Sequence, residues 1–133
     1  MEQVPESMRD LFERETFASF ATVMPDGTPQ VTPVWVDMDD DGYVLVNTAK
    51  GRRKERNVRE NPKVGVQVLD PDDPYRYVSI RGGVEAVTQD GAVEHIDALA
   101  QRYMGVDEYP NHGEEGGPRV IIRIRPDRVV TSG

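Results

Sequence analysis

Residues 43–62 read YVLVNTAKGRRKERNVRENP, and this stretch does most to decide the fold of the chain. Its first part, residues 43–48, is apolar and β-branched, which is typical of a strand. Residues 50–59 then place six basic side chains against one acid, and the following Asn61-Pro62 ends the segment, because a residue before proline disfavours helical backbone. The stretch therefore predicts a strand followed by a short basic helix.

The basic segment contrasts with the rest of the chain, which is acidic. The 133 residues carry a formal net charge of −8, and outside residues 50–59 there are 10 bases against 23 acids. Cations at a helix N-terminus are unfavourable, because the helix dipole already places about half a positive charge there. A bound anion reverses this cost. We interpret the segment as a phosphate-binding site; the alternative is a solvated helix face with Glu55 and Arg59 paired one turn apart.

The remainder of the sequence predicts short strands joined by turns. A helical pattern at residues 5–15 precedes strands at residues 17–24 and 30–37, which are linked by the hairpin signal Asp26-Gly27. The further expected elements are an alternating strand at 64–68, a loop at 70–74, a long strand at 77–87 with a bend at 81–83, a helix capped by Asp90, an irregular loop at 105–117 and a strand at 119–125. Six strands and three helices without regular βαβ alternation predict a mainly β (α+β) fold, a small barrel in one domain spanning residues 1–133.

Several classes of site and location are excluded or disfavoured. The chain has no cysteine, which removes disulfides, thiolate catalysis and iron–sulfur sites. Asp37, Asp39 and Asp41 open like a calcium loop, but position 12 of that loop is Thr48 rather than glutamate, so a turn is expected. His95 and His112 are expected at the surface, without zinc. The absence of a signal-peptide pattern and of an apolar run of about 20 residues predicts a cytoplasmic protein.

Four stretches of the chain resemble the FMN-binding split β-barrel superfamily, the pyridoxamine 5′-phosphate oxidase-like proteins. They are residues 21–31 (ATVMPDGTPQV), 32–35 (TPVW), 52–62 (RRKERNVRENP) and the pair Arg81-Gly82. Within the superfamily, the chain looks most like the short branch that uses the deazaflavin coenzyme F420. The resemblance implies a six-stranded antiparallel split β-barrel with Greek-key-like connections and about three short helices.

The resemblance also implies where a cofactor would bind. Arg52 and Lys54 would hold the cofactor phosphate, with Asn47 and Thr48 at the strand end beneath it. The ring would lie along the second strand, and Tyr75 or Tyr77 would reach the ring of a partner, because members of the family are homodimers with sites at the subunit interface. The full set of expected cofactor-binding residues is Thr32, Pro33, Val34, Trp35, Asn47, Thr48, Arg52, Arg53, Lys54, Asn57 and Tyr75.

By the same resemblance, the expected function is an oxidoreductase that binds reduced coenzyme F420 (an 8-hydroxy-5-deazaflavin) and passes a hydride to a small or planar organic acceptor. The cofactor carries such chemistry, so no catalytic residue is expected. The alternatives are an FMN-dependent oxidase or flavin reductase, and a flavin- or pigment-binding module without turnover. Binding of nucleic acid through the basic helix ranks last, and the negative charge of the chain also argues against binding to an anionic membrane. Vitamin B6 oxidation is not expected, because the chain ends at residues 129–133 (VVTSG) without an Arg-Leu-x-Pro-like motif.

The pattern of the second strand separately predicts self-association. Its apolar residues fall on both faces, with Val34, Val36 and Met38 on one side and Val31, Pro33 and Trp35 on the other. A small barrel buries one face of a strand, so the other face needs a partner or a ligand. An isologous homodimer with binding sites at its interface satisfies both faces.

Overall fold

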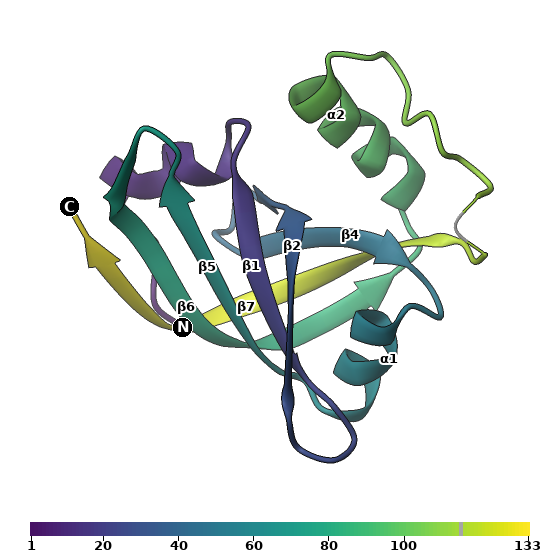
Figure 1. The fold of residues 1–133 in the computed structure, drawn as a ribbon, viewed down its shortest axis with the longest axis horizontal. Helices are drawn as coiled ribbons and strands as arrows, with labels where there is room; N and C mark the ends of the chain where they lie inside the picture. The colour runs from purple at the N-terminus through teal and green to yellow at the C-terminus, as the bar shows by residue number, and fades with distance from the viewer. Residues whose placement is uncertain (115) are drawn as a thin grey trace.

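A single curled antiparallel sheet carries three helical segments at its edges in the computed structural model, which describes residues 1–114 and 116–133 (Figure 1). The elements in chain order are η1 (Glu6–Phe12), β1 (Phe17–Val23), β2 (Pro29–Trp35), β3 (Asp37–Met38), β4 (Val44–Ala49), α1 (Arg53–Glu60), β5 (Lys63–Asp70), β6 (Asp73–Thr88), α2 (Ala92–Met104) and β7 (Arg119–Ser132). The strand order is β2-β1-β5-β6-β7-β4-β3. This confirms the predicted fold class, with seven strands rather than six in the described part of the chain.

The additional strand explains why the sheet curls. The expected strand at residues 30–37 is divided at the buried Val36: β2 pairs with β1, whereas β3 pairs with β4. β2 and β3 lie at opposite ends of the strand order but are one residue apart in the chain. The two edges of the sheet must therefore approach each other, which gives the split-barrel shape.

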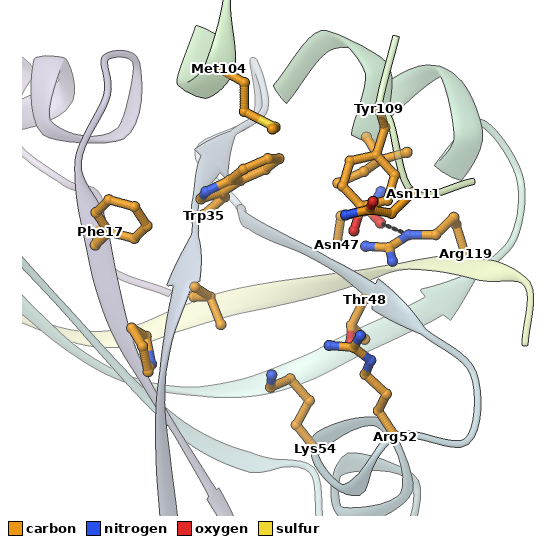
Figure 2. Close-up of a pocket in the computed structure, with 13 residues that line it drawn as sticks. Phe17, Trp35, Asn47, Thr48, Arg52, Lys54, Met104, Tyr109, Asn111 and Arg119 are labelled. Atoms are coloured by element: carbon orange, nitrogen blue, oxygen red, sulfur yellow. Dashed lines mark hydrogen bonds between the residues drawn. The ribbon is translucent and has the colours of Figure 1, made fainter. Parts of the chain in front are cut away.

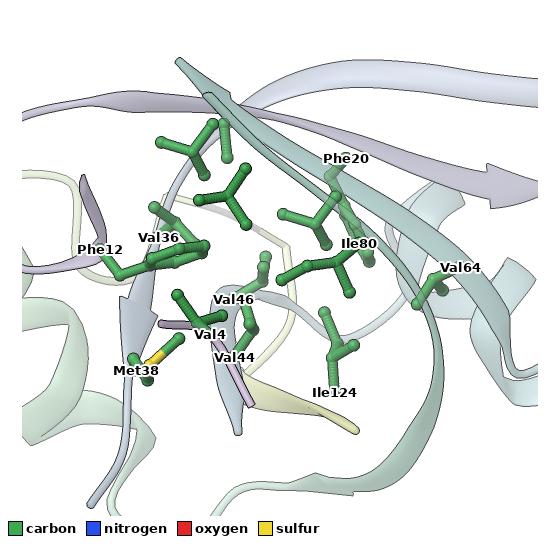
Figure 3. Close-up of a cluster of buried hydrophobic side chains, with 14 of the residues drawn as sticks. Val4, Phe12, Phe20, Val36, Met38, Val44, Val46, Val64, Ile80 and Ile124 are labelled. Atoms are coloured by element: carbon green, nitrogen blue, oxygen red, sulfur yellow. The ribbon is translucent and has the colours of Figure 1, made fainter. Parts of the chain in front are cut away.

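The concave face of the sheet holds the main hydrophobic core, in which side chains from most strands interdigitate (Figure 3). Phe20 of β1, Ile80 of β6 and Ile124 of β7 are at most 1% exposed, in line with the period of two along each strand. The helix η1 adds Leu11 and Phe12, which are fully buried. A second, smaller cluster on α2 consists of Ile96, Leu99 and Tyr103 and packs against Trp35 and Tyr109.

Buried polar contacts fix α1 on the barrel. The Asn57 side-chain amide donates to Thr22 Oγ1 of β1 at 3.0 Å. The buried Glu55 carboxylate accepts a 2.7 Å hydrogen bond from the Gly51 backbone N–H, and it also pairs with Arg59 one turn later. The Asn57 contact holds α1 on β1, and the Glu55 contact joins the first turn of α1 to the connection that follows β4 (Figure 1).

Three local expectations need correction. The residue at the start of α2 is Gly91 with a φ of +72°, and no side chain caps the helix, so the prediction of Asp90 as the cap is wrong. The expected loop at 70–74 is shorter, because β5 runs to Asp70 and β6 begins at Asp73. Pro74 fits within β6 because it lies in a register shift of the β5–β6 ladder, where its missing N–H breaks no pairing. The last strand, β7, is twice as long as expected and continues to Ser132.

Candidate functional site

A cavity of about 320 Å³ lies where β2, β4 and the start of β7 meet the N-terminus of α1 and the helix α2 (Figure 2). Its lining combines apolar and aromatic side chains with cationic and amide groups: Phe17, Pro33, Val34, Trp35, Asn47, Thr48, Arg52, Lys54, Ile96, Met104, Tyr109, Asn111 and Arg119. Cavities that combine apolar and aromatic walls with convergent polar groups are the usual setting for small-molecule sites.

One end of the cavity is cationic. Arg52 occupies the N-cap position of α1, and Lys54 follows in its first turn. Burial lowers the pKa of Lys54, and the nearby charges of Arg52 and Arg119 lower it further. Burial also lowers the pKa of Arg119, although the Tyr109 hydroxyl partly offsets this. Among the described residues no carboxylate pairs with Lys54. This end of the cavity therefore favours an anion.

A buried hydroxyl points to the same conclusion. Thr48 lines the cavity beside Arg52, is 3% exposed, and its Oγ1 has no hydrogen-bond partner among the described residues (Figure 2). Leaving such a buried group unpaired costs about 1–3 kcal/mol. An acceptor oxygen of a bound ligand would satisfy it. A phosphate group supplies several acceptor oxygens together with negative charge, so the residues present at this end fit a phosphate.

The opposite end of the cavity is aromatic and rigid. The Trp35 indole stacks on the Tyr103 ring with centroids 4.9 Å apart and planes inclined by 12°, and the Tyr109 ring meets it edge-on at 6.2 Å. Tyr103 is itself fixed, because its hydroxyl donates to the Thr16 carbonyl at 2.6 Å and accepts from the Val36 N–H at 3.1 Å. Met104 extends from α2 toward Trp35 (Figure 2). These planar and apolar groups match the surface of a flat ring system.

The structure brings together seven of the eleven residues expected to bind a cofactor. They are Pro33, Val34, Trp35, Asn47, Thr48, Arg52 and Lys54, which all line the cavity. The other four lie outside the lining. Thr32 and Arg53 each leave a buried polar atom without a partner among the described residues. Asn57 is fully buried and attaches α1 to β1. Tyr75 is 81% exposed on β6 and does not line the cavity.

Sequence reasoning missed six lining residues, of which Arg119 and Tyr109 matter most. The Arg119 guanidinium lies 5.2 Å from the Tyr109 ring centroid, and its Nε donates to Asn47 Oδ1 at 2.9 Å. The signal in the sequence was weak: Arg119 is the first residue of an alternating strand, and Tyr109 is an isolated aromatic in an irregular loop. The remaining four, Phe17, Ile96, Met104 and Asn111, carry no distinguishing pattern.

The prediction that His95 lies at the surface is wrong. Its side chain is 10% exposed, with Nε2 at 3.1 Å from Asp37 Oδ2 and Nδ1 at 3.1 Å from Asn47 Nδ2. Arg102 binds the other Asp37 oxygen at 2.9 Å. Burial opposes ionisation of Asp37, but the hydrogen bonds from His95 and Arg102 outweigh it and hold the pKa of Asp37 below its ordinary value. His112 is more exposed and pairs with Asp97 at 2.6 Å.

The described residues form neither a metal-binding cluster nor a membrane-spanning helix. No cluster of three or more His, Asp or Glu side chains could hold a metal ion in that part of the chain. Within residues 1–114 and 116–133, none of the helices has the length and apolar character to cross a membrane.

Comparison with known proteins relates the whole chain to one family. Residues 4–133 match the family described as Pyridoxamine 5′-phosphate oxidase. A solved structure of a protein described as an F420 reductase is 38% identical, covers 96% of this chain and 98% of its own, and superposes with a TM-score of 0.83. No curated protein sequence matches.

Two more distant structures show the fold alone. A conserved hypothetical protein from Mycobacterium tuberculosis is 24% identical over 99% of this chain and 89% of its own, with a TM-score of 0.75. A protein from Listeria innocua described as a putative pyridoxamine 5′-phosphate oxidase is 19% identical over 95% of each chain, with a TM-score of 0.69.

Proposed function

Since the chain belongs to the pyridoxamine 5′-phosphate oxidase family, we propose that it is an oxidoreductase that binds a phosphorylated flavin-type cofactor, coenzyme F420 in the first place, and passes a hydride to a small or planar organic acceptor. One observation carries the proposal. The same cavity presents a flat aromatic wall at one end, and at the other a cationic cluster around the half-buried Lys54 with an unsatisfied hydroxyl. A ligand with a planar ring and an anionic tail is complementary to both ends.

The proposed roles follow from these positions. Arg52, Lys54 and the Thr48 hydroxyl would hold the phosphate, with the backbone N–H groups at the N-terminus of α1 adding to the same field. Pro33, Val34 and Trp35 would support the ring along β2. When bound, a deazaflavin supplies two-electron hydride transfer. The protein residues bind, orient and exclude water, and none needs to act as an acid or base.

Two features favour coenzyme F420 over FMN. The relative described as an F420 reductase is 38% identical across nearly the full length of both chains. The cavity also gathers three cationic side chains, Arg52, Lys54 and Arg119, which is more than one phosphate requires. The same cavity would suit FMN in an oxidase or flavin reductase, and a flavin- or pigment-binding module without turnover uses the same contacts.

We further propose that the chain forms an isologous homodimer through the convex face of its sheet. Large apolar side chains are exposed there, including Val31 at 60% and Leu69 at 42%. Phe17 and Leu69 are neighbours across β1 and β5, because Ala18 pairs with Val68 in the next rung. Monomeric proteins rarely leave such a face uncovered. Tyr75 at the start of β6 would then be available to the cavity of the other subunit.

A spectroscopic titration tests the cofactor proposal. Trp35 is the only tryptophan of the chain, so its emission reports directly on the cavity. The protein is titrated separately with coenzyme F420 and with FMN while Trp35 emission and cofactor absorption are recorded. We expect saturable quenching with F420, followed by loss of reduced F420 when planar acceptors are added. Unchanged emission with both cofactors would overturn the proposal. Binding without turnover across a broad acceptor panel would favour the non-catalytic module.

A further inference from the structure

A network of polar side chains connects the cavity to the contact between α2 and β3. Asn47 on β4 is the central member, and it contacts groups on both sides. Its Oδ1 accepts a hydrogen bond from Arg119 Nε at 2.9 Å. Its Nδ2 lies 2.9 Å from the Ala92 carbonyl oxygen and 3.1 Å from His95 Nδ1. His95 Nε2 lies 3.1 Å from Asp37 Oδ2.

The donors and acceptors of this network permit a single orientation of the Asn47 amide and a single tautomer of neutral His95. Arg119 Nε–H only donates and the Ala92 carbonyl only accepts, so both fix the Asn47 amide with Oδ1 toward Arg119 and Nδ2 toward Ala92. His95 Nδ1 faces the same Nδ2 donor, so it must be an acceptor and carry no proton. The proton of a neutral His95 then sits on Nε2 and is donated to Asp37.

Protonation of His95 would break this assignment. A second N–H at Nδ1 would face the Nδ2 donor of Asn47. Turning the amide over would satisfy His95, but it would place an N–H against Arg119 Nε–H and an oxygen against the Ala92 carbonyl. Each outcome leaves partly buried polar groups opposed or unpaired, which is unfavourable because their lost contacts with water are not replaced. Asn47 therefore couples the charge of His95 to the seating of Arg119.

We propose that His95 is a positioning residue: in its neutral form it holds the Asn47 amide in the orientation that seats Arg119 in the cavity, and its protonation weakens binding of the anionic ligand. The inference rests on the proposed function, because it assigns Arg119 to the ligand's negative charge. It adds a residue on α2, remote from the phosphate end, to the determinants of affinity, and it makes affinity fall as the pH falls.

Charged groups face His95 from three elements. Asp37 of β3 contacts His95 Nε2 and receives Arg102 of α2 on its other oxygen. Arg119 of β7 lies on the far side of Asn47. Histidine is the side chain that ordinarily changes charge between about pH 5 and 8, so this is the range to examine.

The first test compares two variants of His95. Asparagine at this position keeps an uncharged acceptor close to the place of Nδ1, whereas alanine removes it. Affinity for coenzyme F420 and for FMN is measured by Trp35 quenching from about pH 8 to about pH 5. We expect His95→Ala to bind about three- to tenfold more weakly at pH 8, as for loss of one neutral hydrogen bond. We expect His95→Asn to keep most of the affinity.

The pH profile separates positioning from a merely structural role. The ratio of wild-type to His95→Asn affinity at each pH cancels the titration of the ligand itself, and we expect this ratio to fall as the pH falls. His112→Asn makes the same chemical change at the other histidine, which pairs with Asp97 outside the cavity lining, and it should keep the wild-type profile. A wild-type profile that His95→Asn leaves unchanged, or that His112→Asn removes, would overturn the inference.

A second measurement needs no ligand. In protein labelled with ¹⁵N, the nitrogen shifts of His95 report its tautomer, and the Arg119 Nε–H resonance reports its bond to Asn47. We expect the Nε2–H tautomer at pH 8, and an Arg119 signal that changes with the same midpoint as His95 in wild type but stays constant in His95→Asn. Protonation at Nδ1 at pH 8, or independent midpoints, would overturn the inference. Failure of both cofactors to bind would overturn the proposed function instead, while this experiment still decides the role of His95.

Discussion

Replacement of Lys54 by methionine should weaken cofactor binding and stabilise the free protein. The substitution removes the ammonium group but keeps most of the apolar stem. Lys54 is half-buried at the cationic end of the cavity, where burial and the charges of Arg52 and Arg119 lower its pKa. Burial and the neighbouring charges therefore destabilise the charged form in the free folded state, and a bound anion would offset this cost. The two effects of the substitution have opposite signs, which makes the test sharp.

The size of the binding effect follows from the contact that is lost. A hydrogen bond between a charged donor and a phosphate oxygen contributes about 1.5–3 kcal/mol, so Lys54→Met should bind about 10- to 150-fold more weakly. Because the free-state pKa is lowered and the anion raises it again, wild-type binding takes up a proton near that pKa. Wild-type affinity should therefore fall as the pH rises through the free-state pKa of Lys54, which lies below the ordinary lysine pKa of 10.5. This pH dependence should be absent from the variant.

The lowered pKa of Lys54 also makes the stability of the free protein depend on pH. Between the lowered folded pKa and the ordinary value of the unfolded chain, the unfolded state binds more protons than the folded state. Wild-type stability should therefore rise with pH through this window, and Lys54→Met should lack this contribution. At neutral pH the variant should unfold at a temperature equal to or above that of wild type.

Isothermal titration and differential scanning calorimetry measure the two effects. Arg56→Met is the matched control, because Arg56 lies on the same helix, is exposed, carries the same charge and does not line the cavity. Its affinity should change by a few tenths of a kcal/mol at physiological salt, where exposed charges are screened. Equal affinity losses in the two variants would refute a specific contact between Lys54 and the phosphate, and would indicate a general effect of positive charge on binding. An unchanged affinity in Lys54→Met would also refute the contact.

Three further predictions concern cofactor choice, assembly and folding. Isothermal titration at matched ionic strength should show tighter binding of coenzyme F420 than of FMN, and FMN copurifying stoichiometrically would reverse this preference. Light scattering should give about twice the chain mass of 14.9 kDa without cofactor, and Val31→Lys on the convex face should yield monomers; a wild-type monomer with full affinity would exclude a shared site. Asn57→Ala should lower the free energy of unfolding by about 1–3 kcal/mol in denaturant melts, because it removes a buried hydrogen-bond donor. Cofactor affinity per folded molecule should change little, and a large affinity loss at unchanged stability would instead show that Asn57 binds the cofactor.

The sequence predicts the strands well, because their signals are local. The alternation of Val64, Val66 and Val68 and the hairpin pair Asp26-Gly27 each concern a few neighbouring residues. The phosphate end of the cavity is equally local, since Asn47, Thr48, Arg52 and Lys54 fall within one strand–helix connection. Their grouping in the structure follows from that connection alone.

The contributions of α2 and β7 could not be predicted, because they depend on tertiary contacts. Arg119 reaches the cavity through the pairing of β4 with β7, in which Thr48 lies opposite Val120 across about 70 residues of chain. His95 carries no motif, and only the packing of α2 over β3 and β4 brings it to Asp37 and Asn47. The sequence pattern placed Trp35 on the strand face that needs a partner or a ligand, but Tyr103 of the same chain covers one face of its ring.

The central claim is that one cavity holds the ring and the phosphate of a flavin-type cofactor, and a crystal structure of the protein with coenzyme F420 tests it most directly. We predict phosphate density within hydrogen-bond distance of Lys54 Nζ and Thr48 Oγ1, and the ring alongside Pro33, Val34 and Trp35 of β2. Density for the phosphate at any other place, with the Thr48 hydroxyl still unpaired, would contradict the account.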